Sequence, residues 1–452
     1  MRNFIAKHKP EYAARSKEFV GLAAPIFAEQ MFVVLMGLVT TVLVSRVDEY
    51  ALSAASMVDS IGNLVLAFFG ALAIGATIVV AQYTGRGDRE KTSVVAAQSI
   101  VLAAICGVIF CAFFAIFRTP VVNVLFRQAE YGVRQEARLF LGIIAFSFPA
   151  VAIMMTTFGV LRGSGNTGVP MIITIIINIV NVTLGIVLIR SLGVAGAALA
   201  LLISRCIGAT LGLLYIAKKS LSIRFTGIRD FKPDFSVQRI VLRFGIPTSI
   251  ESGTFQMGKL LITVFIAGMG TAAIAANAIV GSVSSILIAP GSSFSTGATI
   301  LIGQRIGRGE TGDVKKSAYF TVGAAMLVLL VVSIFSFLLL GPIVSLFETT
   351  DEMLVILRPV LITLVIAMPI AWPSSFITPS ALRATGDVKY AMVAAIASMV
   401  FVRVAFAWVL GVFFGLGILG VWISMYMDWV VRSVLFLGRV HSGKWMGKGA
   451  VK

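Results

Sequence analysis

GATIVVAQYTGRGD at residues 75–88 occurs again, in related form, as GATILIGQRIGRGE at residues 297–310. The displacement from residue 75 to residue 297 relates other parts of the chain as well. Further segments match at this spacing or at one position less: ALSAASMVDS at 51–60 with AIAANAIVGS at 273–282, Pro25 with Pro247, and LRGSGNTGVPM at 161–171 with LRATGDVKYAM at 382–392. Several matches at one spacing predict that the chain is built from two homologous halves.

The composition places both halves in a lipid bilayer. Of the 452 residues, 58% are apolar and 13% are charged, and the mean hydropathy is +0.99. A helix that crosses about 30 Å of hydrocarbon needs roughly 20 apolar residues. Twelve runs are long enough: 19–45, 52–82, 92–118, 138–161, 168–189, 194–217, 239–268, 272–303, 315–341, 353–382, 388–413 and 417–438. The alternating pattern of a transmembrane β-barrel is absent, so we expect an all-α integral membrane protein.

Six helices in each half determine how the halves are related. An even number returns the chain to the same side of the membrane, so the two six-helix lobes should be related by a pseudo-twofold axis along the membrane normal. We predict an N-terminal lobe at 1–217 (helices 1–6), a cytoplasmic linker at 218–238 and a C-terminal lobe at 239–452 (helices 7–12). Parallel repeats of this kind place a substrate path between the lobes.

The formal net charge of +17 follows membrane topology. With a cytoplasmic N-terminus, 27 of the 37 Lys and Arg residues fall in cytoplasmic segments, 7 fall in external loops and 3 fall inside helices. This bias obeys the positive-inside rule, so both termini are predicted to be cytoplasmic. Four bases between residues 118 and 138 are the exception, and we interpret this stretch as an amphipathic segment at the membrane surface. The bases therefore indicate membrane lipids, and no nucleic acid, as partners.

Ionisable side chains inside the predicted helices are candidate functional residues, because a charge at bilayer depth is costly. They are Glu29, Asp59, Arg205, Glu251, Lys259, Arg403 and Asp428. Glu29 and Glu251 each follow the repeated proline by four residues, so the duplication places one carboxylate at the same depth in each lobe. Such a carboxylate is suited to exchange a proton, a metal cation such as Na⁺ and an organic cation. The alternative is that a basic neighbour neutralises it or that it lies near the head groups.

Residues near these acids complete the predicted cation- and substrate-binding set. Phe255 lies one helical turn after Glu251, where an aromatic ring suits a lipophilic cation, although a purely structural role is the alternative. The adjacent Gln256 offers an amide to the same cavity. Asp59 ranks second because its repeat mate is Gly281.

Other residues in the helices are assigned by their type and spacing. We expect Asn178 and Asn181 to hydrogen-bond or to face the cavity. Pro25 and Pro247 are predicted hinges, because proline interrupts helical hydrogen bonding. Asp428 and Arg432, four residues apart, are expected to form a pair within their helix.

The motifs exclude several function classes. No Walker motif is present, so ATP is not the expected energy source. The three cysteines lie in apolar runs without metal-ligand spacing and are interpreted as packing residues. No constellation of catalytic residues is found, so we expect neither an enzyme nor a cofactor beyond a coupling ion. A channel, which would predict passive flux, is an alternative class.

The ordered motifs resemble a bacterial member of the MATE (multidrug and toxic compound extrusion) family. They are AQYTGRGD, GQRIGRGE, LRGSGNTGVP, LRATGD, FGIPTSIESGTFQMGK and MDWVVRSVLFLGRVHSGKW, and together they cover nearly the whole chain. The resemblance implies a secondary active antiporter in the bacterial cytoplasmic (inner) membrane. It would export cationic or amphiphilic small molecules in exchange for H⁺ or Na⁺, and we expect it to be a monomer.

The chain departs from the family pattern at three places. Thr40 and Gly185 stand where many members have acids in the N-terminal lobe, and Phe255 stands where other branches have the acid of helix 7. The resemblance therefore implies that the coupling site, including any Na⁺ site, has moved to Glu251. The main alternative function is a flippase for lipid-linked oligosaccharide or polysaccharide precursors, which should favour a basic cavity. Four acids against three bases inside the helices mildly favour cation efflux.

Overall fold

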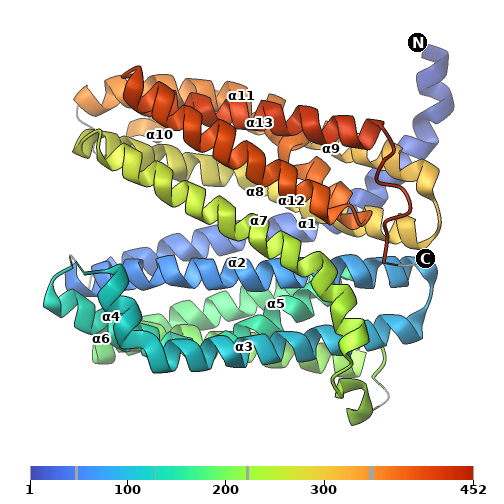
Figure 1. Ribbon diagram of the computed structural model, residues 1–452, viewed down its shortest axis with the longest axis horizontal. Coiled ribbons are helices and arrows are strands. Elements are labelled where there is room, and N and C mark those ends of the chain that lie inside the picture. The colour runs from blue at the N-terminus through green and yellow to red at the C-terminus, as the bar shows by residue number, and fades with distance from the viewer. Residues whose placement is uncertain are drawn as a thin grey trace. The chain divides into compact units, whose positions relative to one another are not determined.

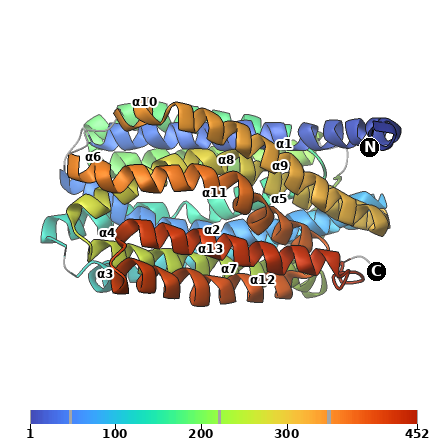
Figure 2. The same cartoon turned by 90° about the horizontal axis from the view of Figure 1, so that it is seen from above.

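A computed structural model describes residues 2–45, 49–127, 129–219, 223–225, 227–345 and 351–450 of the chain, and every regular element in these ranges is helical (Figure 1). The α-helices are α1 (Arg2–Ser45), α2 (Glu49–Arg86), α3 (Arg89–Leu125), α4 (Tyr131–Ala145), α5 (Phe148–Gly163), α6 (Gly168–Lys219), α7 (Phe235–Ala267), α8 (Thr271–Gly307), α9 (Thr311–Leu338), α10 (Leu340–Ser345), α11 (Asp351–Ala384), α12 (Val388–Ala397) and α13 (Gly417–His441). A 3-10 turn, η1 (Ile228–Phe231), precedes α7. Two π-helical segments, η2 (Ser398–Val404) and η3 (Ala407–Phe413), continue α12 beside α13 (Figure 2).

Within the described ranges, nine helices are long and apolar enough to cross a membrane, and ten if the bent pair α4 and α5 is one span. The long α6 contains a break at Gly193, whose φ of 56° lies in the left-handed region that glycine adopts without strain. Dividing α6 there gives the two predicted runs 168–189 and 194–217. Helix α7 is not among the nine apolar helices, but it covers the predicted run 239–268. With α4 and α5 taken as one span, α6 as two and α7 included, the described helices correspond to the twelve predicted runs.

The predicted helix at 138–161 is wrong in detail. The structure has two helices there, α4 and α5, bent by 51° at Phe146 and Ser147. Pro149 in the first turn of α5 has no N–H to donate, so the helix starts anew instead of continuing. Helix α4 begins inside the stretch interpreted as amphipathic, and it buries Val133 and Phe140 while Arg134 and Arg138 stay partly exposed. The predicted amphipathic character is therefore present in the second part of that stretch.

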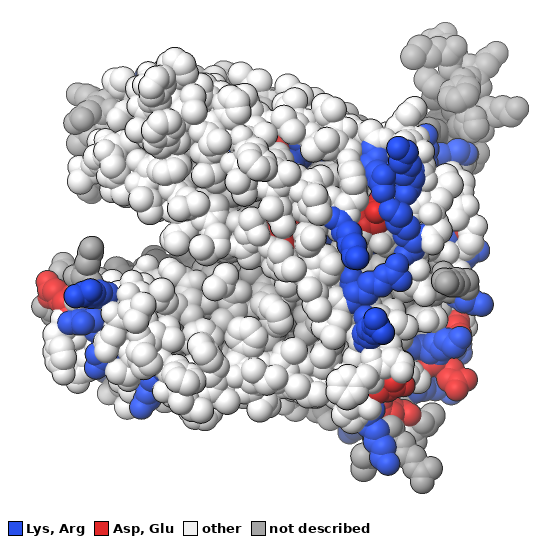
Figure 3. All heavy atoms as spheres, viewed as in Figure 1, with Lys and Arg blue, Asp and Glu red and all other residues white. Residues whose placement is uncertain are grey.

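The surface has the character of a protein in contact with lipid. Large apolar side chains are exposed along several helices, among them Ile116, Leu338 and Phe401. Figure 3 shows the larger group of Lys and Arg toward one end of the face in view and a smaller group at the opposite end, with a wide, almost uncharged area between them. Exposed apolar surface of this extent fits a hydrocarbon environment, in which the helices satisfy their own backbone hydrogen bonds.

Contacts divide the chain into two compact units. Unit 1 comprises Met1–Phe27 and Ile250–Lys452, and unit 2 comprises Ala28–Ser249. The beginning of α1 thus packs with the second half of the chain, and the beginning of α7 packs with the first half. The two cuts, after Phe27 and after Ser249, fall at matching positions of the sequence repeat. The predicted lobe boundaries at 217 and 239 follow the sequence repeat and stay a prediction.

The glycines of the repeated GAT motif, at residues 75–77 and 297–299, explain why the beginnings of α1 and α7 can pack closely against the other half of the chain. In unit 2, a Cβ added to Gly75 of α2 would lie 2.9 Å from the backbone nitrogen of Gly245 and 2.9 Å from the carbonyl oxygen of Val241, both on α7. In unit 1, a Cβ added to the repeat mate Gly297 of α8 would lie 3.0 Å from the ring of Phe19 on α1. Each half therefore uses a glycine to admit the start of the other half's first helix.

Polar contacts reinforce the packing of α1 in unit 1. Arg15 of α1 and Arg305 of α8 both pair with Asp313 of α9, and Arg305 also contacts Glu18 of α1 at 3.1 Å. Phe19 packs edge-on against Phe294, with ring centroids 5.1 Å apart. These contacts fix the beginning of α1 to α8 and α9.

The predicted linker is part of unit 2 and is bound to α3 at Ser93, which accepts from the backbone N–H of Arg224 at 3.0 Å, and at one buried amide. Gln98 of α3 donates to the carbonyl oxygens of Asp230 at 2.9 Å and Lys232 at 2.7 Å. Its own carbonyl oxygen accepts from the backbone N–H of Asp234 at 2.8 Å. Residues 220–222 and 226 of the predicted linker lie outside the described residues.

The two GAT glycines should differ in their tolerance of alanine. Gly75→Ala forces backbone atoms apart and should lower the free energy of unfolding by about 1–3 kcal/mol, whereas Gly297→Ala meets only the edge of a ring that can shift. Gly62→Ala, also on α2 but with open space around it, is the control and should be neutral or stabilising. Thermal unfolding of the detergent-purified variants measures the order. Equal melting temperatures for Gly75→Ala and Gly62→Ala would contradict the packing described.

Candidate transport site

The predicted carboxylate of unit 2 is part of an ion pair. Glu29 of α1 is 4% exposed, and its Oε1 accepts from Nη2 of Arg162 at the end of α5, at 2.5 Å. The hydroxyl of Thr174 on α6 donates to the same oxygen at 3.1 Å. The second oxygen, Oε2, is buried and has no hydrogen-bond partner among the described residues. A buried acid paired at one oxygen and open at the other can accept a proton or a cation.

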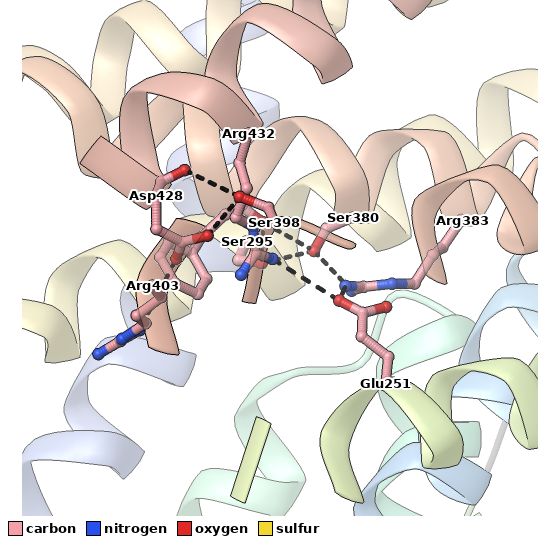
Figure 4. A network of polar contacts seen from close by, with 9 residues as sticks. Glu251, Ser295, Ser380, Arg383, Ser398, Arg403, Asp428 and Arg432 are labelled. Atoms are coloured by element: carbon pink, nitrogen blue, oxygen red, sulfur yellow. Dashed lines mark hydrogen bonds and ion pairs between the residues drawn. The ribbon is translucent and has the colours of Figure 1, made fainter. Parts of the chain in front are cut away.

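The carboxylate of unit 1 repeats this arrangement. Oε1 of Glu251 on α7 accepts from Nη2 of Arg383 at the end of α11, at 2.8 Å, and Nη2 of Arg432 on α13 lies 3.7 Å away (Figure 4). Its Oε2 is likewise buried without a partner in the described part of the chain. Arg383 is also the repeat mate of Arg162, in LRATGD and LRGSGN. The duplication has therefore preserved a complete Glu–Arg pair in each unit.

The arginines of these pairs were missed as site residues. Hydropathy assigns both to the cytoplasmic ends of their helices, and each lies far from its acid in the sequence. The internal repeat could have identified them. Arg162 and Arg383 occupy matching positions in the two halves, as Glu29 and Glu251 do, so each half carries the same acid and the same base. The sequence had left open that a basic neighbour neutralises each glutamate. In the structure both Glu29 and Glu251 have such a neighbour.

A second polar group lies between α13 and the π-helical segment η2. Asp428 is fully buried, accepts from the hydroxyl of Ser398 at 2.5 Å, and lies 3.8 Å from Nη1 of Arg403 (Figure 4). The predicted pair of Asp428 with Arg432 is present as an electrostatic attraction but not as a direct ion pair, since the carboxylate of Asp428 is held by η2. The guanidinium of Arg432 instead lies 4.7 Å from the ring centroid of Phe376 and faces Glu251.

Unit 1 contains a partly open cavity of about 750 Å³. Its apolar wall is made of large side chains from α7, α11 and α13: Phe255, Trp372, Phe376, Trp422, Met425 and Trp429. Its charged lining residues, within the described chain, are Lys259 and Arg403. We call this space the aromatic cavity. Phe255 lines it as predicted, whereas Gln256 and Glu251 are not among its lining residues.

The remaining predicted residues of unit 2 are spread over several contacts. Asp59 on α2 is exposed, and the guanidinium of Arg205 donates to Ser147 at 2.7 Å. Asn178 donates to the carbonyl of Thr174 at 2.7 Å, and Asn181 donates to the hydroxyl of Ser204 at 3.4 Å. Both asparagines therefore hydrogen-bond to neighbours, which is one of the two predicted roles.

The two predicted hinge prolines and Thr40, one of the departures from the family pattern, lie on the first helices of the two halves. Pro25 and Pro247 lie inside α1 and α7, and their role as hinges stays a prediction. Each precedes the cut between units by two residues. The side chain of Thr40 is outside the described residues.

Comparison with known proteins decides the family. The family model described as MatE matches residues 25–187 and again 247–409. The chain belongs to the MatE family. The two matched ranges start at the repeated prolines, Pro25 and Pro247, so the internal repeat is confirmed as a duplication of the MATE module.

Similar proteins agree with this assignment. The chain is 30% identical to a probable multidrug resistance protein NorM from Thermotoga maritima, over 98% of this chain and 96% of that protein. It is 28% identical to an uncharacterized transporter, YisQ, from Bacillus subtilis, over 97% and 96%. A solved structure of an outward-facing multidrug resistance MATE family transporter superposes with a TM-score of 0.87 at 21% identity, covering 95% of this chain and 97% of that chain. The all-α membrane fold with twelve helices in two lobes is confirmed, and the protein is a multi-pass membrane transporter of bacterial type.

Breaking the Glu29–Arg162 pair should lower the free energy of unfolding of this MATE transporter. Arg162→Met leaves a buried carboxylate without its cation and should cost about 3–5 kcal/mol of unfolding free energy. Adding Glu29→Gln removes the unpaired charge, so the double variant should be more stable than Arg162→Met alone. The exposed Arg127→Met variant is the control for loss of one arginine. Unfolding in mixed micelles measures the wild type and these three variants, and a double variant no more stable than Arg162→Met alone would contradict the pair.

Proposed function

We propose that this MATE protein is a secondary active efflux antiporter that exports amphiphilic small molecules in exchange for inward-moving H⁺ or Na⁺. The relatives named for multidrug resistance support efflux and do not favour the flippase alternative. The observation that carries the exchange mechanism is the duplicated Glu–Arg pair. In each pair one carboxylate oxygen is bound to arginine, and the other is buried without a hydrogen-bond partner among the described residues.

The free oxygen gives the coupling ion a place to act. A proton on Oε2 of Glu251 would neutralise the carboxylate and weaken its attraction to Arg383, and Na⁺ would compete with the arginine for the same negative charge. Ion occupancy would thereby change how firmly α7 is held to α11. The same reasoning applies to Glu29, which links α1 to α5.

The position of the pairs along their helices suggests why ion binding is coupled to movement. Glu29 and Glu251 each lie two residues beyond the point where their helix passes from one compact unit to the other. A change of charge at that point acts on the segment that both units share. A two-state element biased by a local charge is the general basis of such coupling.

The sequence also predicted cationic substrates. This prediction rested on acids inside the membrane, and in the structure the two matched acids are paired with arginine. The proposal therefore keeps the amphiphilic character of the substrate and assigns the acids to the coupling ion. We further propose that the protein resides in the bacterial inner membrane with both termini in the cytoplasm, as the positive-inside bias indicates.

Transport in proteoliposomes tests the proposal. An imposed pH gradient and an imposed Na⁺ gradient are compared as driving forces for two fluorescent amphiphilic dyes, one cationic and one anionic. Glu251→Gln cannot exchange a charge and should abolish gradient-driven movement of the transported dye while leaving expression intact, whereas Glu251→Asp should retain part of it.

The control is Lys389→Gln, an exposed position outside both pairs, which should transport normally. Undiminished transport by Glu251→Gln would remove this residue from the mechanism. Dye movement that no ion gradient accelerates would overturn the antiport proposal itself.

A further inference from the structure

The charged lining of the aromatic cavity is basic. Lys259 on α7 and Arg403 on η2 both contribute to the wall, and no acid does so among the described residues. Each of the two neighbouring acids is engaged at one oxygen, Glu251 with Arg383 and Asp428 with Ser398, and neither lines the cavity. A cation entering this cavity would meet positive charge.

The surrounding charges do not balance. Four bases, Lys259, Arg383, Arg403 and Arg432, share two acids, Glu251 and Asp428. The contact of Arg403 with Asp428, at 3.8 Å, is too long for a hydrogen bond, and the described chain places no acid in an ion pair with Lys259. An excess of positive charge inside a membrane protein is unfavourable until an anion is bound.

The ring of Phe255 is already occupied by the protein's own cations. Nζ of Lys259 lies 5.2 Å from its centroid, and Cζ of Arg403 lies 5.1 Å from it. The predicted use of Phe255 for a substrate cation would add a third positive charge at the same ring, which like-charge repulsion disfavours. The ring instead orients two cations at the cavity wall.

Unpaired hydrogen-bond donors also point to a ligand that accepts. Nε of Arg403 and Nε1 of Trp429 are buried and have no acceptor among the described residues. Both groups can only donate, as can the ammonium of Lys259. A carboxylate or sulfonate supplies acceptor oxygens and the missing negative charge together.

The part of the wall formed by α11 and α13 suits an aromatic body, while α8 adds one amide and several hydroxyl groups between Asn277 and Thr296. The rings of Trp372 and Phe376 stack at 4.8 Å, and Phe376 meets Phe255 and Trp429 edge-on at 6.3 and 6.5 Å. A volume of about 750 Å³ lies within the usual range for small-molecule pockets, which are mostly apolar with a few placed polar groups.

Arg403 is presented by a π-helical segment, a rare conformation that occurs frequently at functional sites.

We propose that the aromatic cavity binds an amphiphilic aromatic anion, with Lys259 and Arg403 as countercharges to its carboxylate or sulfonate and the Trp and Phe side chains against its ring. That this anion is then exported rests on the proposed function. Binding itself does not, so a binding measurement separates failure of this site from failure of antiport.

The test uses two probes with the same ring and opposite charge, 1-naphthalenesulfonate and 1-naphthyltrimethylammonium. Their binding to the full-length protein in phosphatidylcholine nanodiscs is measured by equilibrium dialysis. The sulfonate should bind more tightly than the ammonium. Lys259→Gln should weaken sulfonate binding about tenfold without weakening ammonium binding, and Lys259→Arg should retain most of the sulfonate affinity. Lys389→Gln makes the same charge change outside the cavity and should alter neither.

Three results would overturn the proposal. They are tighter binding of the ammonium than of the sulfonate, sulfonate binding that is unchanged in Lys259→Gln, and loss of sulfonate binding when the nanodiscs contain phosphatidylglycerol. The last result would assign the cavity to an anionic lipid head group. Because Lys259 is exposed and outside the ion pairs, its substitution is expected to leave folding intact, and the melting temperature of Lys259→Gln verifies this.

Discussion

An ionised side chain inside a bilayer must be compensated, and this constraint explains the arrangement of three of the four acids within the helices of this protein. Glu29 and Glu251 are each held by an arginine from the end of another helix. Asp428 is held by a serine and lies near Arg403. Among the described residues, compensation is incomplete at one oxygen of each glutamate and at Lys259. We propose that these are the places where the transporter binds an ion or a ligand.

The internal duplication gives this constraint its symmetry. Each half provides one glutamate after a proline, one arginine at the end of a later helix, and one glycine that admits the start of a helix at close range. The helix starts are exchanged between the two compact units, so α1 and α7 each belong to both. The asymmetry is equally informative. The basic residues Lys259 and Arg403 have as repeat counterparts Gly37 and Asn181 or Val182, so the basic aromatic cavity is a feature of the second half.

The helical membrane fold could be predicted because its signals, apolar runs and repeated motifs, can be read directly in the sequence. Hydropathy finds the spans, and the constant displacement between the two copies finds the duplication and the matched glutamates. The break between α4 and α5 was missed because hydropathy does not report the effect of Pro149. The partners of the acids were missed because Arg162 and Arg383 lie far from them in the sequence and at helix ends. The i, i+4 spacing of Asp428 and Arg432 predicted a local pair, but tertiary contacts with Ser398 and Glu251 prevailed.

The central claim is that the coupling ion is exchanged at the duplicated Glu–Arg pair. Infrared difference spectroscopy of the purified protein tests it most directly, because a protonated carboxyl group has a C=O band that a carboxylate lacks. Lowering the pH should produce such a band from the carboxyl groups of the protein; part of it should be missing in Glu251→Gln and a further part when Glu29→Gln is added, while the bands of the other acids remain. Na⁺ bound at the pair should reduce the same parts of the band. A band that is unchanged in the double variant would contradict the claim.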